Sequence, residues 1–329
     1  MTVLVTGGAG YIGSHMVWRL LDAGEKVVVV DRLSTGFNWA VPKEANLIVC
    51  DIGEQDRIEA VLREHDVQSV FHFAGSIVVP DSVADPLGYY LNNTVKSRTL
   101  IEACVNAGVS QFIFSSTAAV YGTPDGVEPV SEDAATRPES PYGTSKLMTE
   151  LMLRDTAAAY PMNYACLRYF NVAGADPDGR TGQSTLDATH LIKVATQTAL
   201  GKRSGMQIFG DDYPTEDGTC IRDYIHVSDL IEAHYLALLH LRKTGENLVA
   251  NCGYGHGLSV LQVIDAVKRI SGSDFKVQMA GRRAGDAISI VANSDHIKQQ
   301  LDWRPRYDDL DQIVTHALDW EKALDRRNN

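Results

Sequence analysis

Residues 2–13 read TVLVTGGAGYIG, an apolar run typical of a short buried strand, followed by glycines at 7, 10 and 13 that open a helix. The pyrophosphate of a dinucleotide needs close approach to the backbone and free N–H groups at a helix N-terminus, and these glycines provide both. A plain turn between strand and helix also favours glycine. The context favours the first interpretation, because a second strand, KVVVVD at 26–31, follows and ends on Asp31. The stretch predicts a dinucleotide-binding βαβ unit.

The alternation of strand and helix continues outward from this unit. Apolar runs of strand length recur, with helical patterns between them. These runs are LIVCD (47–51), SVFHFAG (69–75), QFIFSS (111–116) and NYACLRYFNVAG (163–174). Parallel strands buried on both faces need such crossover helices. We therefore expect an α/β protein with a Rossmann-type doubly wound parallel sheet.

After Gly174 the alternation becomes irregular. The stretch GADPDGRTGQST is rich in Gly, Asp and Pro, and it precedes one helical pattern, HLIKVATQTALG, and the loop GDDYPTEDGTC. We expect a smaller mixed α/β region here that binds the substrate. The predicted domains are residues 1–174 for the dinucleotide and residues 175–329 for the substrate, with segments that interleave.

Composition argues against several functions. The chain has 329 residues, of which 44% are hydrophobic, so it can bury a sizeable core. Its net charge of −12 and the lack of a basic run argue against a nucleic-acid partner. No apolar stretch approaches the roughly 18 residues of a membrane span, and a strand that begins at Thr2 leaves no room for a signal peptide. We expect a cytoplasmic protein without membrane contact.

The cysteines do not suggest a metal or redox site. They are widely spaced, form no CxxC pair and mostly lie in apolar runs. We interpret them as reduced core residues and expect no metal. They are Cys50, Cys104, Cys166, Cys220 and Cys252.

Asp31 indicates which dinucleotide binds. It lies 18 residues beyond Gly13, where a carboxylate can accept hydrogen bonds from the adenosine ribose hydroxyls. It would repel the 2′-phosphate of NADP, so NAD is favoured. Arg32 leaves the alternative open, because an arginine beside the acid is a common way to accommodate that phosphate. A plain turn residue at the end of the strand is the other interpretation of Asp31.

Tyr142 and Lys146 are four residues apart in a predicted helix that begins near Pro141, so they share one face. A tyrosine with its ordinary pKa of about 10 is a poor base at neutral pH. A lysine ammonium and a positive nicotinamide ring nearby would favour the phenolate. The spacing also arises by chance on helix surfaces. The upstream glycines and the hydroxyl cluster of Ser115, Ser116 and Thr117 favour an oxidoreductive site.

Motifs along nearly the whole chain resemble those of the extended short-chain dehydrogenase/reductase family, and within it the UDP-glucose 4-epimerases. They are TGGAGYIGSH, FHFAG, PLGYYLNN, FIFSSTAAVYG, SPYGTSKLMTE, RYFNVAG, YPTEDGTCIRDYIHVSDL and RRAGD. The resemblance implies an NAD-dependent isomerase that interconverts UDP-glucose and UDP-galactose at carbon 4. The implied route passes through a 4-keto sugar, with NAD reduced and reoxidised in place and therefore tightly retained.

The resemblance also assigns roles to matching residues. The implied catalytic residues are Thr117, which holds the sugar, Tyr142, which is acid and base, and Lys146, which binds the nicotinamide ribose and tunes the tyrosine. The implied cofactor-binding residues are Gly7, Gly10, Tyr11, Ile12, Gly13, Asp31, Arg32, Leu33, Ser34, Thr35, Gly36, Asp51, Ile52, Phe73, Ala74, Gly75, Asn92, Tyr142, Lys146 and Phe170. The implied substrate-binding residues are Thr117, Asn171, His190, Leu191, Gln207, Phe209, Arg222, Tyr224, Arg283 and Asp286.

Three positions depart from the family pattern. Residues 190–193 read HLIK where many relatives have Asn-Leu-(Ile/Met)-Pro in contact with the substrate. Ile77 stands where some relatives have a lysine. Ile290 occupies a position thought to limit N-acetylated sugars, and its intermediate bulk leaves the range of substrates open.

Other functions occur on the same architecture. A nucleotide-sugar 4,6-dehydratase needs an Asp-Glu pair after the hydroxyl residue, where this chain has Ala118 and Ala119. A UDP-glucuronate decarboxylase shares most of the architecture. 4-Epimerases of UDP-N-acetylhexosamines, UDP-pentoses or UDP-uronates stay open, because pocket volume decides among them. A silent NAD-binding protein would be expected to lose Tyr142 and Lys146. The resemblance also implies a homodimer through the helices of about 86–108 and 141–160.

Overall fold

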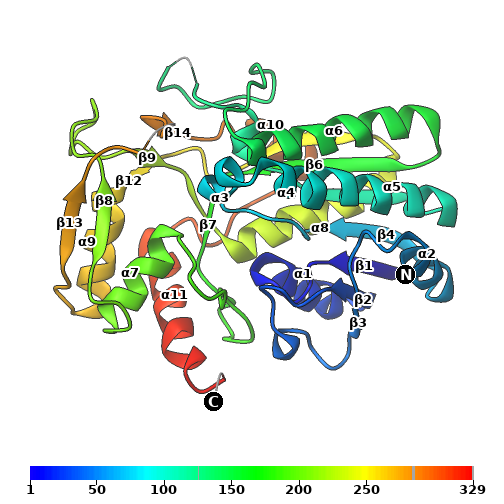
Figure 1. Ribbon diagram of the computed structural model, residues 1–329, viewed down its shortest axis with the longest axis horizontal. Helices are drawn as coiled ribbons and strands as arrows, with labels where there is room; N and C mark the ends of the chain where they lie inside the picture. Colours follow the sequence, from blue (N-terminus) through cyan, green and yellow to red (C-terminus); the bar gives the residue numbers. More distant parts are fainter. Residues whose placement is uncertain (125, 284–285, 328–329) are drawn as a thin grey trace.

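The computed structural model describes residues 1–124, 126–283 and 286–327, and its centre is a seven-stranded sheet (Figure 1). The strand order is β11-β6-β5-β4-β1-β2-β3, and every neighbouring pair is parallel. The strands are β1 (Thr2–Thr6), β2 (Lys26–Asp31), β3 (Asn46–Val49), β4 (Val67–His72), β5 (Gln111–Ser115), β6 (Asn163–Tyr169) and β11 (Leu248–Cys252). The order reverses between β1 and β4, which is where open α/β sheets bind ligands.

Helices cover both faces of the sheet. One face packs on α1 (Tyr11–Asp22) and α8 (Val227–Thr244), and the other on α2 (Gln55–Glu64), α5 (Lys96–Ala107) and α6 (Pro141–Ala159). The alternation of side chains along β1 explains the two cores, because Val3 and Val5 belong to one and Leu4 to the other. The Rossmann-type doubly wound sheet predicted from the sequence is confirmed.

One predicted strand is two strands. The run NYACLRYFNVAG is interrupted at Phe170, because β6 ends at Tyr169 and the chain then leaves the main sheet. The next strand, β7 (Asn171–Ala173), pairs instead with β10 (Tyr224–His226). A continuous apolar run cannot indicate such a change of partner, because both strands are buried.

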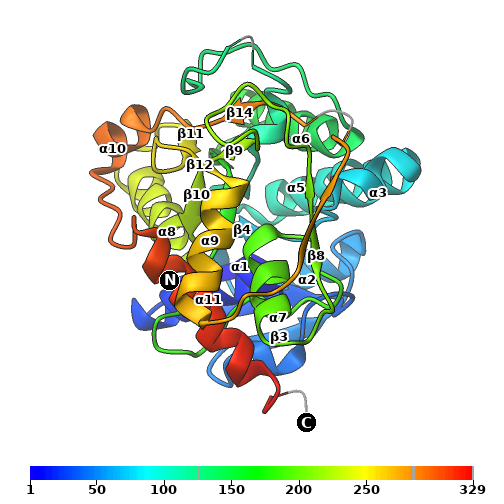
Figure 2. The ribbon, with the colours of Figure 1, turned by 90° about the vertical axis from the view of Figure 1, so that its left-hand side faces the viewer.

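The smaller region is mixed α/β, as predicted. Strand β8 (Met206–Phe209) pairs with β13 (Val277–Ala280), and β9 (Ile221–Arg222) lies between β12 (Leu258–Ser259) and β14 (Ser289–Ile290). Figure 2 shows three helices of this region, which pack together on the side toward the viewer. They are α7 (Leu191–Ala199), α9 (Val260–Ser271) and α11 (Leu310–Leu324).

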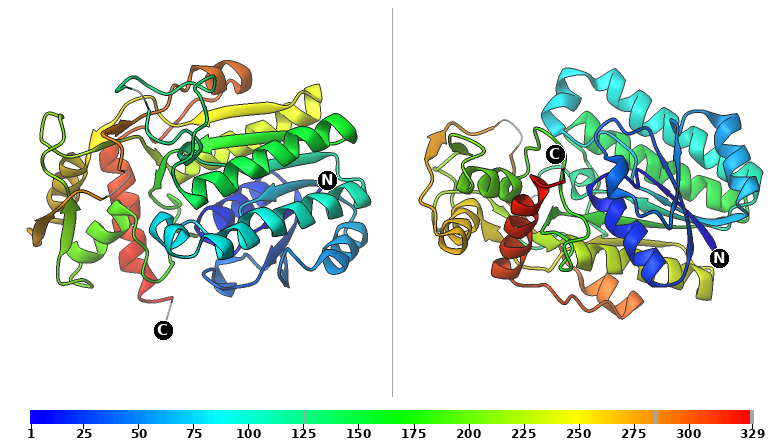
Figure 3. Two further views of the ribbon diagram at one scale, coloured as in Figure 1. Left: turned by 45° about the horizontal axis from the view of Figure 1, so that its top comes forward. Right: turned by 90° about the horizontal axis from the view of Figure 1, so that it is seen from below.

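The two regions share segments. After β10 the chain returns to the main sheet through α8 and β11, and α10 (Asp295–Leu301) packs on both of them. In both views of Figure 3 the red helix α11 lies between the smaller region and the sheet. The division at residue 174 remains a prediction, because the structure shows interleaved segments rather than one boundary.

Short elements connect β4 to α5 and β5 to α6. They are α3 (Val79–Ala84), α4 (Pro86–Tyr89), the π-helical turn η2 (Tyr90–Val95) and the 3-10 turn η3 (Ala118–Val120), and another 3-10 turn, η1 (Asn38–Ala40), follows β2. The segment predicted as one long helix from 86 to 108 is thus α4, η2 and α5 end to end. Such π-turns occur often at functional sites.

The part of the chain that the structure describes has neither a membrane-spanning helix nor a cluster of metal-ligating side chains. None of the helices in ranges 1–124, 126–283 and 286–327 is long and apolar enough to cross a bilayer. Within the same ranges no three His, Cys, Asp or Glu side chains are grouped to hold a metal ion. The five cysteines are buried and free. The cytoplasmic location expected from the sequence stays a prediction.

Candidate functional site

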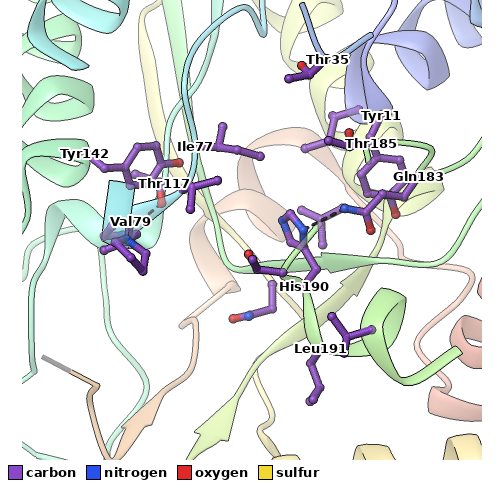
Figure 4. A pocket seen from close by; sticks show the side chains of 18 of the residues that line it. Tyr11, Thr35, Ile77, Val79, Thr117, Tyr142, Gln183, Thr185, His190 and Leu191 are labelled. Carbon is purple, nitrogen blue, oxygen red and sulfur yellow. Dashed lines mark hydrogen bonds between the residues drawn. The ribbon is translucent and has the colours of Figure 1, made fainter. Parts of the chain in front are cut away.

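One cavity of about 1450 Å³ runs from the carboxyl ends of β1 and β4 to the smaller region. All the predicted site residues line it except Leu33, Gly36 and Lys146. Figure 4 shows its middle, where Tyr142 and Thr117 lie on one side, Tyr11 and Gln183 on the other. The cavity therefore joins the predicted cofactor and substrate residues into one continuous site.

The glycines at the start of α1 are required by close contacts. Gly7 has a φ of +71°, and a Cβ on it would lie 2.7 Å from the backbone nitrogen of Ala74. A Cβ on Gly13 would lie 2.1 Å from the carbonyl oxygen of Gly7. Gly10 caps α1 without a side chain, so the first N–H groups of this 12-residue helix face the cavity uncovered. This bare helix start fits the pyrophosphate of a dinucleotide.

Asp31 is held in place at the adenosine end of the predicted cofactor site. Its carboxylate accepts hydrogen bonds from the backbone N–H groups of Ala9, at 3.0 Å, and Leu33, at 2.7 Å. Leu33 thus contacts Asp31 through its backbone N–H and does not line the cavity itself. Gly36 packs on Ala9, since a Cβ there would lie 2.6 Å from the Ala9 carbonyl carbon.

Arg32 is engaged by an acid rather than free to hold a phosphate. Its Nη1 lies 3.3 Å from Asp51 Oδ2, and Lys96 Nζ lies 2.5 Å from the same oxygen. These two cations lower the pKa of Asp51 against the effect of its partial burial. Asp51 is therefore held as a carboxylate beside Arg32, and the presence of a second acid, Asp31, at this end suits ribose hydroxyls and disfavours a 2′-phosphate.

The start of α6 places Tyr142. The Ser140 side chain accepts from the N–H of Gly143 at 3.1 Å, and Pro141 takes the first helical position. A Cβ on Gly143 would lie 2.5 Å from the carbonyl oxygen of Ala119, so glycine allows α6 to approach η3. This approach brings the Tyr142 hydroxyl to Thr117, the residue that caps η3.

Burial is the main influence on the ionisation of Tyr142 and Lys146. Burial raises the pKa of Tyr142, while a hydrogen bond with Thr117 lowers it. Burial lowers the pKa of Lys146 to about 8, while the charge of Glu150 raises it. Lys146 Nζ donates to the carbonyl oxygen of Ser115 at 3.0 Å and lies behind the cavity wall. Burial therefore favours the phenol of Tyr142, and a positive charge close to the ring would favour the phenolate.

A buried ion pair supports α6 behind Lys146. Glu150, one turn after Lys146, accepts from Arg168 Nη2 of β6 at 2.6 Å, and the side chains of the two residues are 6% and 8% exposed. Ser116 also donates to Glu150, and Arg168 Nη1 donates to Tyr121 Oη at 3.0 Å. The network joins α6, β6 and η3 at one point.

Two arginines lie at the end of the cavity formed by the smaller region. Arg222 lies 3.5 Å from Asp286 and donates to the carbonyl oxygens of Ile221 and Ala287. Arg283 lies over the ring of Phe209 at 3.6 Å. Planar guanidinium groups suit a diphosphate, even in a chain of net charge −12. Residues 284–285 of the RRAGD motif lie outside the described part of the chain.

Sequence reasoning missed two supporting residues near the cofactor end. Asn93, next to the predicted Asn92 in η2, accepts from the N–H of Ser76 at 2.8 Å and donates to the carbonyl oxygen of Ser76 and to Ser145 Oγ. It ties the segment after β4 to α6. Glu150 was missed too. Neither has a local signal, because each contacts residues far away in the sequence.

Comparison with known proteins identifies the family. Residues 3–253 match the NAD dependent epimerase/dehydratase family. The chain belongs to that family. Among relatives of this epimerase/dehydratase, the UDP-glucose 4-epimerase of Azospirillum brasilense is 57% identical over 324 residues, which cover 98% of this chain and 93% of the relative.

Two solved structures extend the match to this epimerase/dehydratase in three dimensions. UDP-glucose 4-epimerase from Brucella ovis in complex with NAD has a TM-score of 0.94 and 42% identity, over 97% of both chains. The UDP-Glc/GlcNAc 4-epimerase of Campylobacter jejuni has a TM-score of 0.86 and 47% identity, over 98% of this chain and 99% of the other. The likeness thus includes both regions of the epimerase/dehydratase fold.

Proposed function

We propose that this protein is an NAD-dependent UDP-glucose 4-epimerase, which converts UDP-glucose and UDP-galactose into each other. One observation carries the proposal: the bare start of α1, the pair Tyr142 and Thr117, and the arginines Arg222 and Arg283 all line a single cavity. In Figure 4 Tyr142 and Thr117 lie across this cavity from Tyr11. A dinucleotide and a nucleotide sugar placed end to end would meet at the tyrosine. Two of the relatives described above are UDP-glucose 4-epimerases, one of them with NAD bound, and the third is a UDP-Glc/GlcNAc 4-epimerase.

The residues divide the work of the reaction. The glycine loop and Asp31 would hold NAD, which when bound would supply an acceptor for the hydride of carbon 4 and the means to return it. Tyr142 takes the proton of the 4-hydroxyl and later gives it back to the 4-keto oxygen. Thr117 orients that oxygen, and Arg222 and Arg283 hold the diphosphate while the keto sugar turns. Ala118 and Ala119, which line the cavity beside Thr117, offer no acid or base for the elimination of water.

The test is turnover without added cofactor. Purified protein given UDP-glucose alone should form UDP-galactose until the two sugars reach equilibrium, because a retained NAD is regenerated in every cycle. The product is measured by anion-exchange chromatography, and bound NAD by the nucleotide released on acid denaturation.

Parallel reactions with UDP-N-acetylglucosamine and UDP-xylose measure the range of substrates, which Ile290 at the cavity wall helps to set. No conversion of any of the three, in protein that contains NAD, would contradict the proposed function. Release of water from UDP-glucose would instead indicate a dehydratase.

We also infer a homodimer, formed through the helices on the α6 side of the sheet. The elements α4, η2 and α6 pack together on this side of the sheet. Their outer surface exposes large apolar side chains at helical spacing. They are Leu87, Leu91 and Val95 of α4 and η2, and Met148 and Leu151 of α6, which are 40–78% exposed. A contiguous patch of this kind favours burial against a second copy.

Leu91→Glu should convert the dimer to a monomer, because it places a charge at the centre of this patch. Light scattering coupled to gel filtration measures the mass. The matched control is Leu239→Glu, since Leu239 is 40% exposed on α8, on the opposite face of the sheet. A dimer that persists in Leu91→Glu would place the interface elsewhere.

A further inference from the structure

The substrate side of the cavity contains an imidazole whose orientation is fixed by a neighbouring amide. His190 is the residue before α7, and its Nδ1 lies 2.8 Å from Nε2 of Gln183. Both residues line the cavity, and Gln183 is 8% exposed. In Figure 4 the hydrogen bond leaves the ring on the side away from Tyr142 and Thr117. The rest of the ring faces the space that a ligand would fill.

The partner of Nδ1 determines where the proton of His190 lies. An amide N–H donates and cannot accept, so Nδ1 is the acceptor. Burial lowers the pKa of His190, which keeps the ring neutral at neutral pH. A neutral imidazole has one N–H, and with Nδ1 as acceptor it is on Nε2. His190 therefore offers the cavity a hydrogen-bond donor rather than a lone pair.

Gln183 is in turn held from behind by a buried lysine. Lys193 Nζ, in the first turn of α7, donates to the carbonyl oxygen of Gln183 at 2.6 Å. It also pairs with Glu321 of α11, and the side chains of this pair are 4% and 2% exposed. Lys202 Nζ lies 2.9 Å from the same carboxylate. The pair anchors the backbone of Gln183 to two helices of the smaller region.

We propose that Gln183 is a positioning residue that presents the Nε2–H of His190 to the diphosphate and hexose of the bound UDP-sugar. The identity of this ligand rests on the proposed function. Phosphate and hydroxyl oxygens accept hydrogen bonds, so an N–H attracts them where a lone pair would repel. Two departures from the family pattern thus act together, because His190 makes the contact and Lys193 holds the backbone of Gln183, whose side-chain amide orients the ring.

A double-mutant cycle tests the coupling. Gln183→Ala should raise KM for UDP-glucose about tenfold and leave kcat within about twofold, because only a binding contact is lost. His190→Ala should raise KM to a similar extent, and the double variant should be no worse than His190→Ala. Bound NAD and melting temperature should stay at wild-type values, as in the matched control Gln300→Ala on the surface of α10. If the rise in KM of the double variant equalled the product of the two single rises, the residues would act independently and the proposal would be overturned.

Gln183→Glu tests the orientation of the His190 ring without a change in packing. Glutamate has nearly the shape of glutamine, but its carboxylate can only accept hydrogen bonds. The carboxylate would accept a hydrogen bond from Nδ1–H and raise the pKa of His190. Below that pKa the cationic ring still donates through Nε2, and above it the neutral ring turns a lone pair to the ligand. The ratio of KM in the variant to KM in wild type should therefore rise as pH increases from about 6 to about 9. A flat ratio would overturn the proposal.

The ratio of the two KM values reports on the imidazole of His190 rather than on other ionisable groups. The charged residues that line this side of the cavity are Glu139, Arg203, Arg222, Lys276, Arg283 and Asp286. All of them are present in both proteins, so their titration affects both KM values and cancels in the ratio.

Calorimetric titration of wild type with UDP-glucose distinguishes a failure of the proposed function from a failure of the role proposed for Gln183. No binding and no turnover overturns the proposed function and with it the ligand named here. Normal binding by wild type and equally tight binding by Gln183→Ala overturns only the role of Gln183.

Discussion

Tyr142→Phe should lower kcat for the conversion of UDP-glucose by about 10²–10⁴-fold, because it removes the proton carrier and little else. The ring is 7% exposed and would pack as before, and the hydroxyl loses only its hydrogen bond with Thr117. Melting temperature and bound NAD should therefore match wild type. The measurement is the rate of UDP-galactose formation at saturating UDP-glucose.

The matched control for this variant is Tyr160→Phe, which makes the same change at the other end of α6. Tyr160 is 52% exposed and lies outside the cavity lining, so its loss of a hydroxyl should leave kcat unchanged. If Tyr142→Phe retained kcat within a few-fold of wild type, Tyr142 would not be the acid and base, and the proposed mechanism would fail.

Glu150→Ala should lower the free energy of unfolding by about 3–5 kcal/mol, because it leaves the guanidinium of Arg168 buried without its partner. The pair joins α6 to β6 behind Lys146, which is proposed to be catalytic, and Ser116 loses its acceptor at the same time. Urea unfolding followed by tryptophan fluorescence measures the change. The control is Glu102→Ala, which breaks the exposed pair with Arg98 on α5 and should cost about 0.2–1 kcal/mol.

The paired change Glu150→Leu with Arg168→Met should recover most of this stability, because no buried charge is left alone. It should not recover normal catalysis, since the charge of Glu150 raises the pKa of Lys146 against burial. Equal stability of Glu150→Ala and Glu102→Ala would show that the pair is not buried as described.

The sequence predicted the main sheet because its signals are local. The glycines at 7, 10 and 13, the apolar runs and the helix that begins at Pro141 each act within a few residues. Strand β11 carries no comparable signal. Its residues, LVANC at 248–252, pair with β6, and a pairing between distant segments cannot be inferred from either segment alone.

In the candidate site, too, the residues with a local sequence signal were predicted and those without one were not. Motifs indicated the residues that would touch ligands, and nearly all of these line one cavity. The residues that hold them in place were not predicted. Asn93, Gln183 and Glu150 act through contacts with Ser76, His190 and Arg168, and such contacts exist only once the chain has folded.

The position of β11 has a consequence for how the protein is made. On the ribosome, the strands up to β6 emerge well before residues 248–252, so a nascent chain exposes the edge of β6 for as long as synthesis of the intervening segment lasts. An unpaired edge of a parallel sheet invites association with other chains. Premature termination between β6 and β11 should therefore yield an aggregating fragment rather than a smaller nucleotide-binding protein, and slow translation of this stretch should increase the demand for chaperones.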